Sequence, residues 1–204
     1  MPSRKIITPI LGGHYYHIFN RGVNRQGIFF NPSNYDYFLA LMDKYLSDSD
    51  CVHVLAYCLL PNHFHLVVKI KDEISYQNED SVTSELAVGR VAVGQIRSMF
   101  IAYTMAVNIQ EKRTGALFES KYKRLEIEDD DYLRYVIFYT HYNPEKHGVV
   151  DDFKNYRFSS YRAFLSNKST KIDRDLGLTI FGGKNDFINY HGFLHDEKEA
   201  LTLE

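Results

Sequence analysis

Tryptophan is absent from this chain of 204 residues, and cysteine occurs only twice. Cys51 and Cys58 are seven positions apart in one predicted strand, so we expect their side chains on opposite faces, where they cannot form a disulfide. They also lack the C-x-x-C spacing of a zinc site. So few cysteines are typical of a reducing compartment and argue against a disulfide-stabilised secreted scaffold.

Long hydrophobic runs are missing as well. The longest uncharged apolar stretch covers residues 54–61, whereas a membrane-spanning helix needs roughly 20 apolar residues. The first 13 residues carry two charges and no secretory cleavage pattern. We therefore expect a cytoplasmic protein with no membrane partner.

A large excess of one charge is the third absence. The chain has 24 Lys+Arg against 26 Asp+Glu, a net charge of −2. A protein that coats duplex DNA regardless of sequence would be strongly basic, so this balance argues against that class. It leaves room for a nucleic-acid enzyme with a local basic patch.

Tyrosine and phenylalanine are abundant, at 16 and 14 residues. Hydrophobic residues make up 45% and charged residues 25%, which excludes disordered and collagen-like classes. The length suits one domain that can bury roughly 70% of its unfolded surface. Tyrosine can serve in a core, in base stacking or as a nucleophile, so composition alone leaves the function open.

The pattern along the chain alternates strands and helices in the order β-α-β-β-α-β-α. Pro61-Asn62 separates two strand-like runs and predicts a hairpin, and Pro144 is expected to end the last helix at Asn143. The predicted strands are 14–20, 51–60, 63–70 and 122–127, and the predicted helices are 33–46, 84–112 and 129–143. This order predicts an α+β fold of the split βαβ, ferredoxin-like or RRM-like type, with an antiparallel sheet and helices on one face. We expect a mobile polar loop at 71–82 and a less regular extension at 166–204.

Two histidines flank Phe64 in the second hairpin strand (PNHFHLVV). Residues i and i+2 of a strand project to the same face, so His63 and His65 could place two ring nitrogens on one metal ion. His-x-His pairs also occur by chance in strands. The apolar strand around this pair favours a function, because two imidazoles in a core would each need a partner.

Four tyrosines share one face of the last predicted helix, at 132, 135, 139 and 142. An aromatic core stripe explains three of them. Tyr139 differs because Asn143 follows one turn later on the same face and offers an amide oxygen beside the phenol. Periodicity alone does not resolve whether Tyr139 has a role that the other tyrosines of this stripe lack.

The segment 112–124 (KRTGALFESKYKR) has five basic residues and one acid, with aromatic rings between them. This interleaving suits a single-stranded nucleic acid, although a solvated loop has the same composition. Arg21 and Arg25 follow the first strand and could hold phosphate or form an ordinary turn. The candidate binding residues are Arg21, Arg25, Lys112, Arg113, Lys121, Lys123 and Arg124.

The remaining histidines carry no such pattern. We expect four of them, His14, His17, His53 and His141, to be structural or surface residues. Lys146 and His147, at the end of the last helix, are expected to complement the helix dipole.

Taken together, these motifs resemble the single-tyrosine HUH transposases, and within them most closely the REP-associated tyrosine transposases. The resemblance covers about residues 12–165, which would form the catalytic domain. It is carried by His-Phe-His after Leu-Pro-Asn, Arg-Gly-x-Asn-Arg at 21–25, Gly-Ala-Leu-Phe-Glu-Ser-Lys-Tyr-Lys at 115–123, and Phe-Tyr-Thr-His-Tyr-Asn-Pro-Glu-Lys-His-Gly at 138–148. This chain differs from the family in two respects. The loop at 71–82 and the C-terminal extension are not part of the family's minimal catalytic core, and the near-neutral net charge is less basic than is usual for an enzyme that acts on DNA.

The resemblance implies roles for the motif residues. His63 and His65 would be paired metal ligands, Asn143 a third ligand and Tyr139 the nucleophile. It also implies Mg²⁺ or Mn²⁺ as cofactor, with imidazole favouring Mn²⁺, and single-stranded DNA with a hairpin as substrate. The relatives include monomers and swapped-helix dimers, so a monomer or a homodimer is expected.

Two other classes of function fit the same sequence. A non-enzymatic single-strand binder on this fold would use Tyr15, Phe19 and Tyr57 as stacking platforms. A metal-dependent hydrolase would use His63 and His65 to activate water and would leave no protein–DNA adduct.

Overall fold

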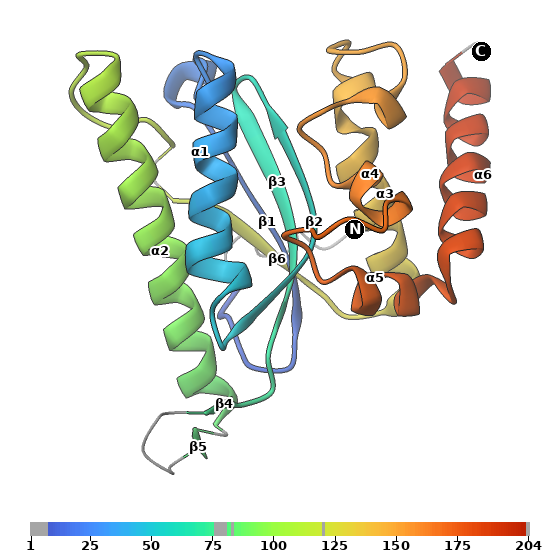
Figure 1. Cartoon of the computed structure of the whole chain (residues 1–204), viewed down its shortest axis with the longest axis horizontal. Coiled ribbons are helices and arrows are strands. Elements are labelled where there is room, and N and C mark those ends of the chain that lie inside the picture. Colours follow the sequence, from blue (N-terminus) through green and yellow to red (C-terminus); the bar gives the residue numbers. More distant parts are fainter. Residues whose placement is uncertain (1–7, 76–80, 83, 120, 203–204) are drawn as a thin grey trace.

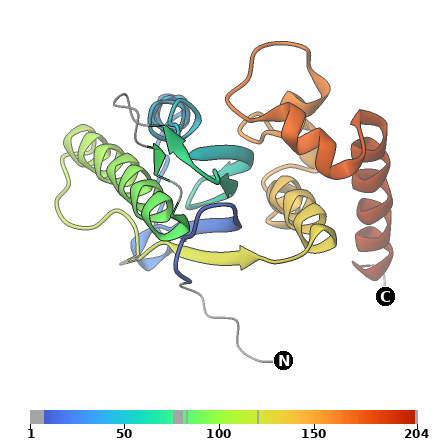
Figure 2. The same cartoon turned by 90° about the horizontal axis from the view of Figure 1, so that it is seen from below.

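In the computed structural model of the chain, a four-stranded antiparallel sheet lies between two layers of helices (Figures 1 and 2). The structure describes residues 8–75, 81–82, 84–119 and 121–202. The strands of the sheet follow one another in the order β2-β3-β1-β6, and every neighbouring pair is antiparallel. They are β1 (Tyr15–Arg21), β2 (Val52–Leu60), β3 (His63–Ile70) and β6 (Lys123–Ile127). The prediction of an α+β fold with an antiparallel sheet is confirmed.

Two helices form one layer, and a capping group in the sequence defines the start of the first. The side chain of Asn31 accepts a hydrogen bond from the amide of Asn34 and caps α1 (Pro32–Met42), which has proline in its first turn. A short π-helical segment, Asp43–Ser47, continues α1. The second helix, α2 (Glu85–Gln110), is the longest in the fold.

Helices cover both faces of the sheet, so the predicted placement on one face is wrong. Phe64 of β3 packs against Phe38 of α1 and Phe100 of α2, with ring centroids 5.3 and 5.2 Å away. The next residue, His65, points to the opposite face and meets Tyr139 of α3 (Asp130–Lys146). Because both faces are covered, β3 is buried along most of its length.

Pro144 predicts that the third helix ends at Asn143, but the helix continues beyond that residue. Asp129 caps its start by accepting a hydrogen bond from the amide of Tyr132 at 2.6 Å. The helix then runs through Pro144 to Lys146, and Pro144 is buried. A proline this near the C-terminus removes only one backbone hydrogen bond, and the burial of its ring offsets that loss.

Between β3 and α2 the described residues include two short strands that the sequence did not predict. These strands, β4 (Ile74–Ser75) and β5 (Ser81–Val82), pair antiparallel. Residues 76–80 of the predicted loop lie outside the described residues.

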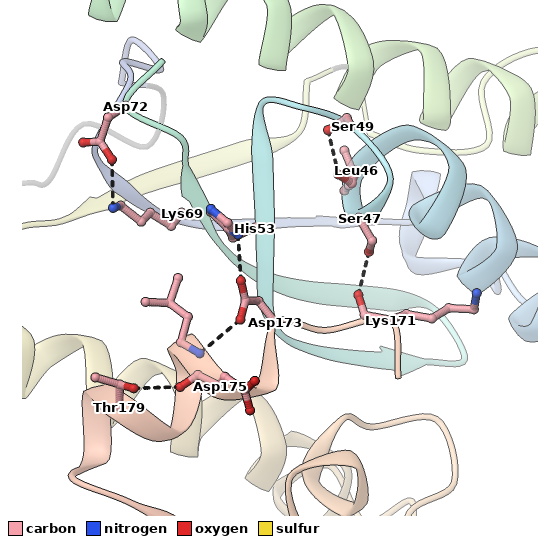
Figure 3. Close-up of polar contacts among 11 residues, drawn as sticks. Leu46, Ser47, Ser49, His53, Lys69, Asp72, Lys171, Asp173, Asp175 and Thr179 are labelled. Atoms are coloured by element: carbon pink, nitrogen blue, oxygen red, sulfur yellow. Dashed lines mark hydrogen bonds and ion pairs between the residues drawn. The ribbon is translucent and has the colours of Figure 1, made fainter. Parts of the chain in front are cut away.

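The C-terminal extension is also regular, contrary to the prediction. It contains α5 (Arg174–Phe181) and α6 (Lys184–Thr202), and it follows a 3₁₀ turn at Phe153–Asn155 and α4 (Tyr161–Leu165). Figure 3 shows how this segment is held to the sheet: Asp173 pairs with His53 of β2 at 2.8 Å. The hydroxyl of Ser47 donates to the carbonyl oxygen of Lys171 at 2.6 Å in the same view.

A buried polar chain joins α6 to α3. His191 Nε2 lies 2.9 Å from His141 Nδ1, and the other nitrogen of His141 lies 2.8 Å from the hydroxyl of Ser160. All three side chains are fully buried, so their hydrogen bonds with one another satisfy polar groups that water cannot reach. The expectation that His141 is structural agrees with this arrangement.

The cysteines lie in separate hydrophobic clusters as free thiols. Across the described ranges, the helices are too short or too polar to cross a lipid bilayer.

Candidate functional site

A cavity of about 370 Å³ opens where β1, β3 and the C-terminal half of α3 meet. Predicted site residues from distant parts of the sequence line it together. The lining includes Arg21, Arg25, His63, His65, Lys123 and Tyr139, together with Phe19, Asn62, Glu119 and His147. The structure thus brings the histidine pair, the candidate nucleophile and three of the predicted basic residues into one site.

The two histidines of β3 project to the same face, as their spacing predicts. Their ring centroids are 5.3 Å apart, and the rings are nearly perpendicular. His63 Nδ1 lies 2.7 Å from the amide oxygen of Asn62, which can only accept, so Nδ1 carries the proton. A neutral His63 therefore has a free lone pair on Nε2.

His65 has the same nitrogen engaged, but its partner is a third histidine. His65 Nδ1 lies 2.8 Å from His17 Nε2, and the two rings stack with centroids 5.0 Å apart. Register explains this contact: Phe19 of β1 pairs directly with His65, and His17 lies two residues away on the same face. The sequence predicts only a structural or surface role for His17, whereas the structure places it in contact with a candidate metal ligand.

Burial keeps the imidazoles of the site neutral. It lowers the pKa of His63 and of His17 to about 4 in each case, with smaller contributions at His63 from His147 and Arg21. Burial, reinforced by His17, holds the pKa of His65 well below its usual range. Neutral imidazole is the form that binds metal ions, so both histidines of β3 have the charge state that ligation requires near pH 7.

Tyr139 projects from α3 over the histidines. Its ring meets His65 edge to face, with centroids 5.9 Å apart. Lys146 Nζ lies 3.3 Å from the tyrosine hydroxyl and 4.6 Å from the ring centroid. The tyrosine hydroxyl is therefore held beside a positive charge, at the edge of a cavity lined by two neutral imidazoles.

Asn143 lies one turn after Tyr139 but does not line the cavity. Its Nδ2 donates to the carbonyl oxygen of Tyr139 at 2.6 Å. Its Oδ1 is fully buried and has no hydrogen-bond partner among the described residues. Tyr139 and His147, four residues to either side, both line the cavity, so Asn143 lies on the same side of α3 as these two residues.

The described ranges contain no group of three or more histidine, cysteine, aspartate or glutamate side chains that could hold a metal ion. The Oδ1 of Asn143 is an oxygen donor of another kind, and a buried acceptor with no partner among the described residues is a costly feature that a ligand would relieve.

The basic residues divide into two sets. Arg21, Arg25 and Lys123 line the cavity, and Arg21 Nε is paired with Glu119 at 2.5 Å. Asn24 and Arg25 have left-handed backbone, with φ of 54° and 59°. Such angles are uncommon outside glycine and store strain, which here presents Arg25 to the cavity.

The other four basic residues lie away from the cavity. Lys112 and Lys121 are exposed, and Arg113 donates to the carbonyl oxygen of Ala116. Arg124 donates to the carbonyl oxygen of Thr8 and to the hydroxyl of Tyr122. In the register of β6, Arg124 pairs with Ile18 and Lys123 with Phe19, so these two neighbours point to opposite faces.

The three aromatic residues suggested as a stacking platform do not share one surface. Phe19 pairs with His65, whereas Tyr57 pairs with Leu66, the next residue of β3. Phe19 and Tyr57 therefore point to opposite faces of the sheet. This placement disfavours the single-strand binder that uses them together.

Three residues of the site were missed by sequence reasoning. His17 contacts His65, His147 meets His63 edge to face at 4.8 Å, and Glu119 pairs with Arg21. Lys146 and His147 were expected only to complement the helix dipole. The contacts of His17, His147 and Glu119 leave no signal in the sequence spacing, because each joins elements far apart in the chain.

Comparisons with known proteins agree with the motifs. Over 108 residues the chain is 27% identical to a protein of Haemophilus influenzae named "Putative REP-associated tyrosine transposase". The match covers 52% of this chain, and it spans 57% of the length of that relative. No family model matches the chain.

The fold is similar to that of a solved protein, "Structure of the REP associates tyrosine transposase bound to a REP hairpin". The TM-score is 0.58 at 18% sequence identity, over 81% of this chain and 86% of the solved chain. The resemblance to REP-associated tyrosine transposases is therefore confirmed in sequence and in fold.

Proposed function

We propose that the chain is a single-stranded DNA transesterase that cleaves and rejoins strands near hairpins through a 5′-phosphotyrosine intermediate. The observation that carries this proposal is the shared cavity of Tyr139, His63 and His65, with both imidazoles neutral. The similarity to REP-associated tyrosine transposases, one of them bound to a REP hairpin, supports the class of substrate.

The fold is consistent with this activity. The strand order β2-β3-β1-β6 is what a ferredoxin-like split βαβ unit produces when β6 follows the second long helix. We assign the catalytic domain to residues 12–165 and regard 166–204 as an extension that supports α3 from behind. The activity would take place in the cytoplasm, with a monomer or a homodimer as the acting species.

A divalent cation, Mg²⁺ or Mn²⁺, fits the donor set of the site. His63 and His65 would hold it through Nε2, and the unpartnered Oδ1 of Asn143 would complete the protein ligands. Mixed imidazole and amide donors suit Mn²⁺ at least as well as Mg²⁺. When bound, the ion supplies a positive charge that binds the scissile phosphate and neutralises its developing negative charge.

Tyr139 supplies the nucleophile. Its hydroxyl oxygen forms a bond to phosphorus while the bond between phosphorus and the 3′ oxygen breaks. The phenol loses one proton and the departing 3′ oxygen gains one. The step needs no external energy source, because one phosphodiester bond replaces another. Attack by another 3′-hydroxyl on the phosphotyrosine reverses the step and rejoins strands.

Lys146 would assist this step. A phenol is a weak nucleophile at neutral pH, and negative charge develops on its oxygen as the proton leaves. The ammonium group of Lys146, 3.3 Å away, can donate to that oxygen and stabilise the charge.

The basic residues would bind the DNA backbone. Arg21, Arg25 and Lys123 lie at the cavity and would hold phosphates beside the scissile one, with Arg21 exchanging Glu119 for phosphate. Lys112, Arg113 and Lys121 would contact the strand further out. Arg124, which is engaged with Thr8, would contribute less than its neighbours.

Incubation of the protein with single-stranded hairpin DNA and Mn²⁺ tests the function. We expect a covalent adduct on a denaturing gel, and no adduct when EDTA is present during the incubation. Cleavage without any adduct would favour the hydrolase instead. Hairpin binding that is unaffected by EDTA and leaves the DNA intact would favour the non-enzymatic binder.

A further inference from the structure

We propose that His17 is a positioning residue that holds His65 in the tautomer whose Nε2 can bind a metal ion. This inference rests on the proposed role of His65 as a ligand. Nothing in the spacing of the sequence singles out His17, and it is not among the residues that line the cavity. It lies behind His65, as seen from the cavity, and acts through it.

The ring of His17 is fixed in place by its surroundings. The side chain is 7% exposed. Phe19 packs beside its ring with centroids 4.8 Å apart, and Tyr139 meets it edge to face at 6.4 Å. Its Nε2 is 2.8 Å from His65 Nδ1, a normal hydrogen-bond distance. His17 therefore contacts both the candidate ligand and the candidate nucleophile from a fixed position.

The direction of that hydrogen bond decides whether His65 can bind a metal. A neutral imidazole carries one N–H and one lone pair. If His17 donated to His65, the single proton of His65 would be on Nε2 and would block coordination there. If His65 Nδ1 donates to His17, the Nε2 of His65 has its lone pair free.

His63 has the second arrangement, and its hydrogen-bond partner fixes the position of its proton. The amide oxygen of Asn62 can only accept, so His63 has its proton on Nδ1. His65 in the same tautomer would give the site two matched Nε2 donors on one face of β3. In metal sites a ligating histidine usually donates its other N–H to such a partner, which fixes the ring and its tautomer. His17 would serve His65 as Asn62 serves His63.

The first test needs no variant and no DNA. Long-range ¹H–¹⁵N correlation spectra of the metal-free, ¹⁵N-labelled protein report which ring nitrogen of each histidine carries the proton. We expect His65 to be protonated on Nδ1 and to have a free lone pair on Nε2. A proton on His65 Nε2 would overturn the inference.

The second test is calorimetric titration with Mn²⁺ alone. In His17→Leu the acceptor is lost, and we expect the affinity to fall by about 10- to 100-fold. His17→Gln puts an amide oxygen four bonds from Cα, as far as Nε2 is in histidine, and should restore binding to within a few-fold. His14→Leu is the matched control, because His14 lies just before the same strand but is paired with Glu126, and this variant should bind as the natural chain does.

Wild-type affinity in a folded His17→Leu variant would contradict the proposed role. If that variant does not fold, the tautomer of His65 measured in the natural chain tests the proposed role of His17. These readouts are separate from catalysis: the expected tautomer and metal affinity without any DNA adduct would refute the transesterase function and leave the role of His17 intact.

Discussion

Lys146 Nζ lies 3.3 Å from the hydroxyl oxygen of Tyr139 and 4.6 Å from the centroid of its ring. The two residues are seven positions apart on α3, about two turns, and the contact depends on the helix continuing past Pro144. A helix that ended at Asn143 would not hold this ammonium group beside the phenol. The continuation of α3 is thus directly relevant to the proposed chemistry.

Replacing Lys146 with methionine should slow formation of the phosphotyrosine adduct by about tenfold, or ~1.4 kcal/mol in the activation barrier. The physical reason is the loss of a positive charge next to the oxygen on which negative charge develops. Single-turnover adduct formation measures the rate, and hairpin affinity should change much less than the rate.

Lys146→Arg should recover most of the rate, since it restores the charge. Lys154→Met is the matched control, because Lys154 also lies over an aromatic ring, that of Phe153, but away from the cavity. An unchanged rate in Lys146→Met, or an equal loss in Lys154→Met, would argue against this role.

Tyr139→Phe should abolish cleavage and the adduct together, because it removes the attacking oxygen and keeps the ring. Tyr142→Phe, one turn further on the same helix, should retain both and cost at most about 1 kcal/mol of stability. Mass spectrometry of the digested adduct should find the nucleotide on the peptide that contains Tyr139. A nucleotide on Tyr135 or Tyr142 would refute the assignment and leave the reaction class standing.

Mn²⁺ should bind at one site, and binding should disappear in the His63→Ala/His65→Ala double variant, as measured by calorimetry. Asn143→Leu should weaken it, since it removes the buried Oδ1 that has no partner among the described residues. Asn108→Leu is the matched control: its Oδ1 is likewise buried and unpartnered within the described ranges, but it lies on α2. Equal effects of the two asparagine variants would indicate general destabilisation instead of ligation.

Lys123 and Arg124 provide a matched pair for DNA binding, because they are adjacent in β6 and point to opposite faces. Lys123→Gln should weaken single-strand binding and reduce the slope of log affinity against log salt by about 0.7, the value for one phosphate contact. Arg124→Gln should leave the slope nearly unchanged. The opposite ranking would place the DNA on the other face of the sheet.

The buried His191 should make stability depend on pH. Burial lowers its pKa to about 3, although its hydrogen bond to the carbonyl oxygen of Phe187 acts in the opposite direction. The groups that face it are His141 on α3, Lys154 and Tyr161.

Below the usual histidine pKa of roughly 6.5, the unfolded chain binds a proton that the folded chain does not. Stability is therefore full above about pH 6.5 and decreases as the pH falls. At pH 5 the loss from this one group should be about 2 kcal/mol. Urea denaturation of the natural chain and of His191→Phe at pH 7 and pH 5 measures it, and the variant should show a smaller loss. An equal loss in both would assign the acid sensitivity to other groups.

Local patterns in the sequence predict much of this fold. The β2-β3 hairpin at Pro61-Asn62 and the starts of helices near residues 33 and 129 follow from turn and helix-start signals within a few residues. The structure places the caps themselves at Asn31 and Asp129. The shared face of His63 and His65 follows from the two-residue repeat of a strand. Such signals can be read without the fold because the interacting groups are neighbours in the chain.

Only the tertiary structure determines what these residues meet. His17 and His65 are 48 positions apart, and their contact depends on the register between β1 and β3. Pro144 stays within a helix because its ring is buried, although its local preference is to end one. The α6 helix likewise acquires a fixed place by packing His191 against His141. The spacing of residues in the sequence therefore determines which side chains share a face. Register and packing between distant segments determine which faces come together, because burial and hydrogen bonding across those segments outweigh local propensity.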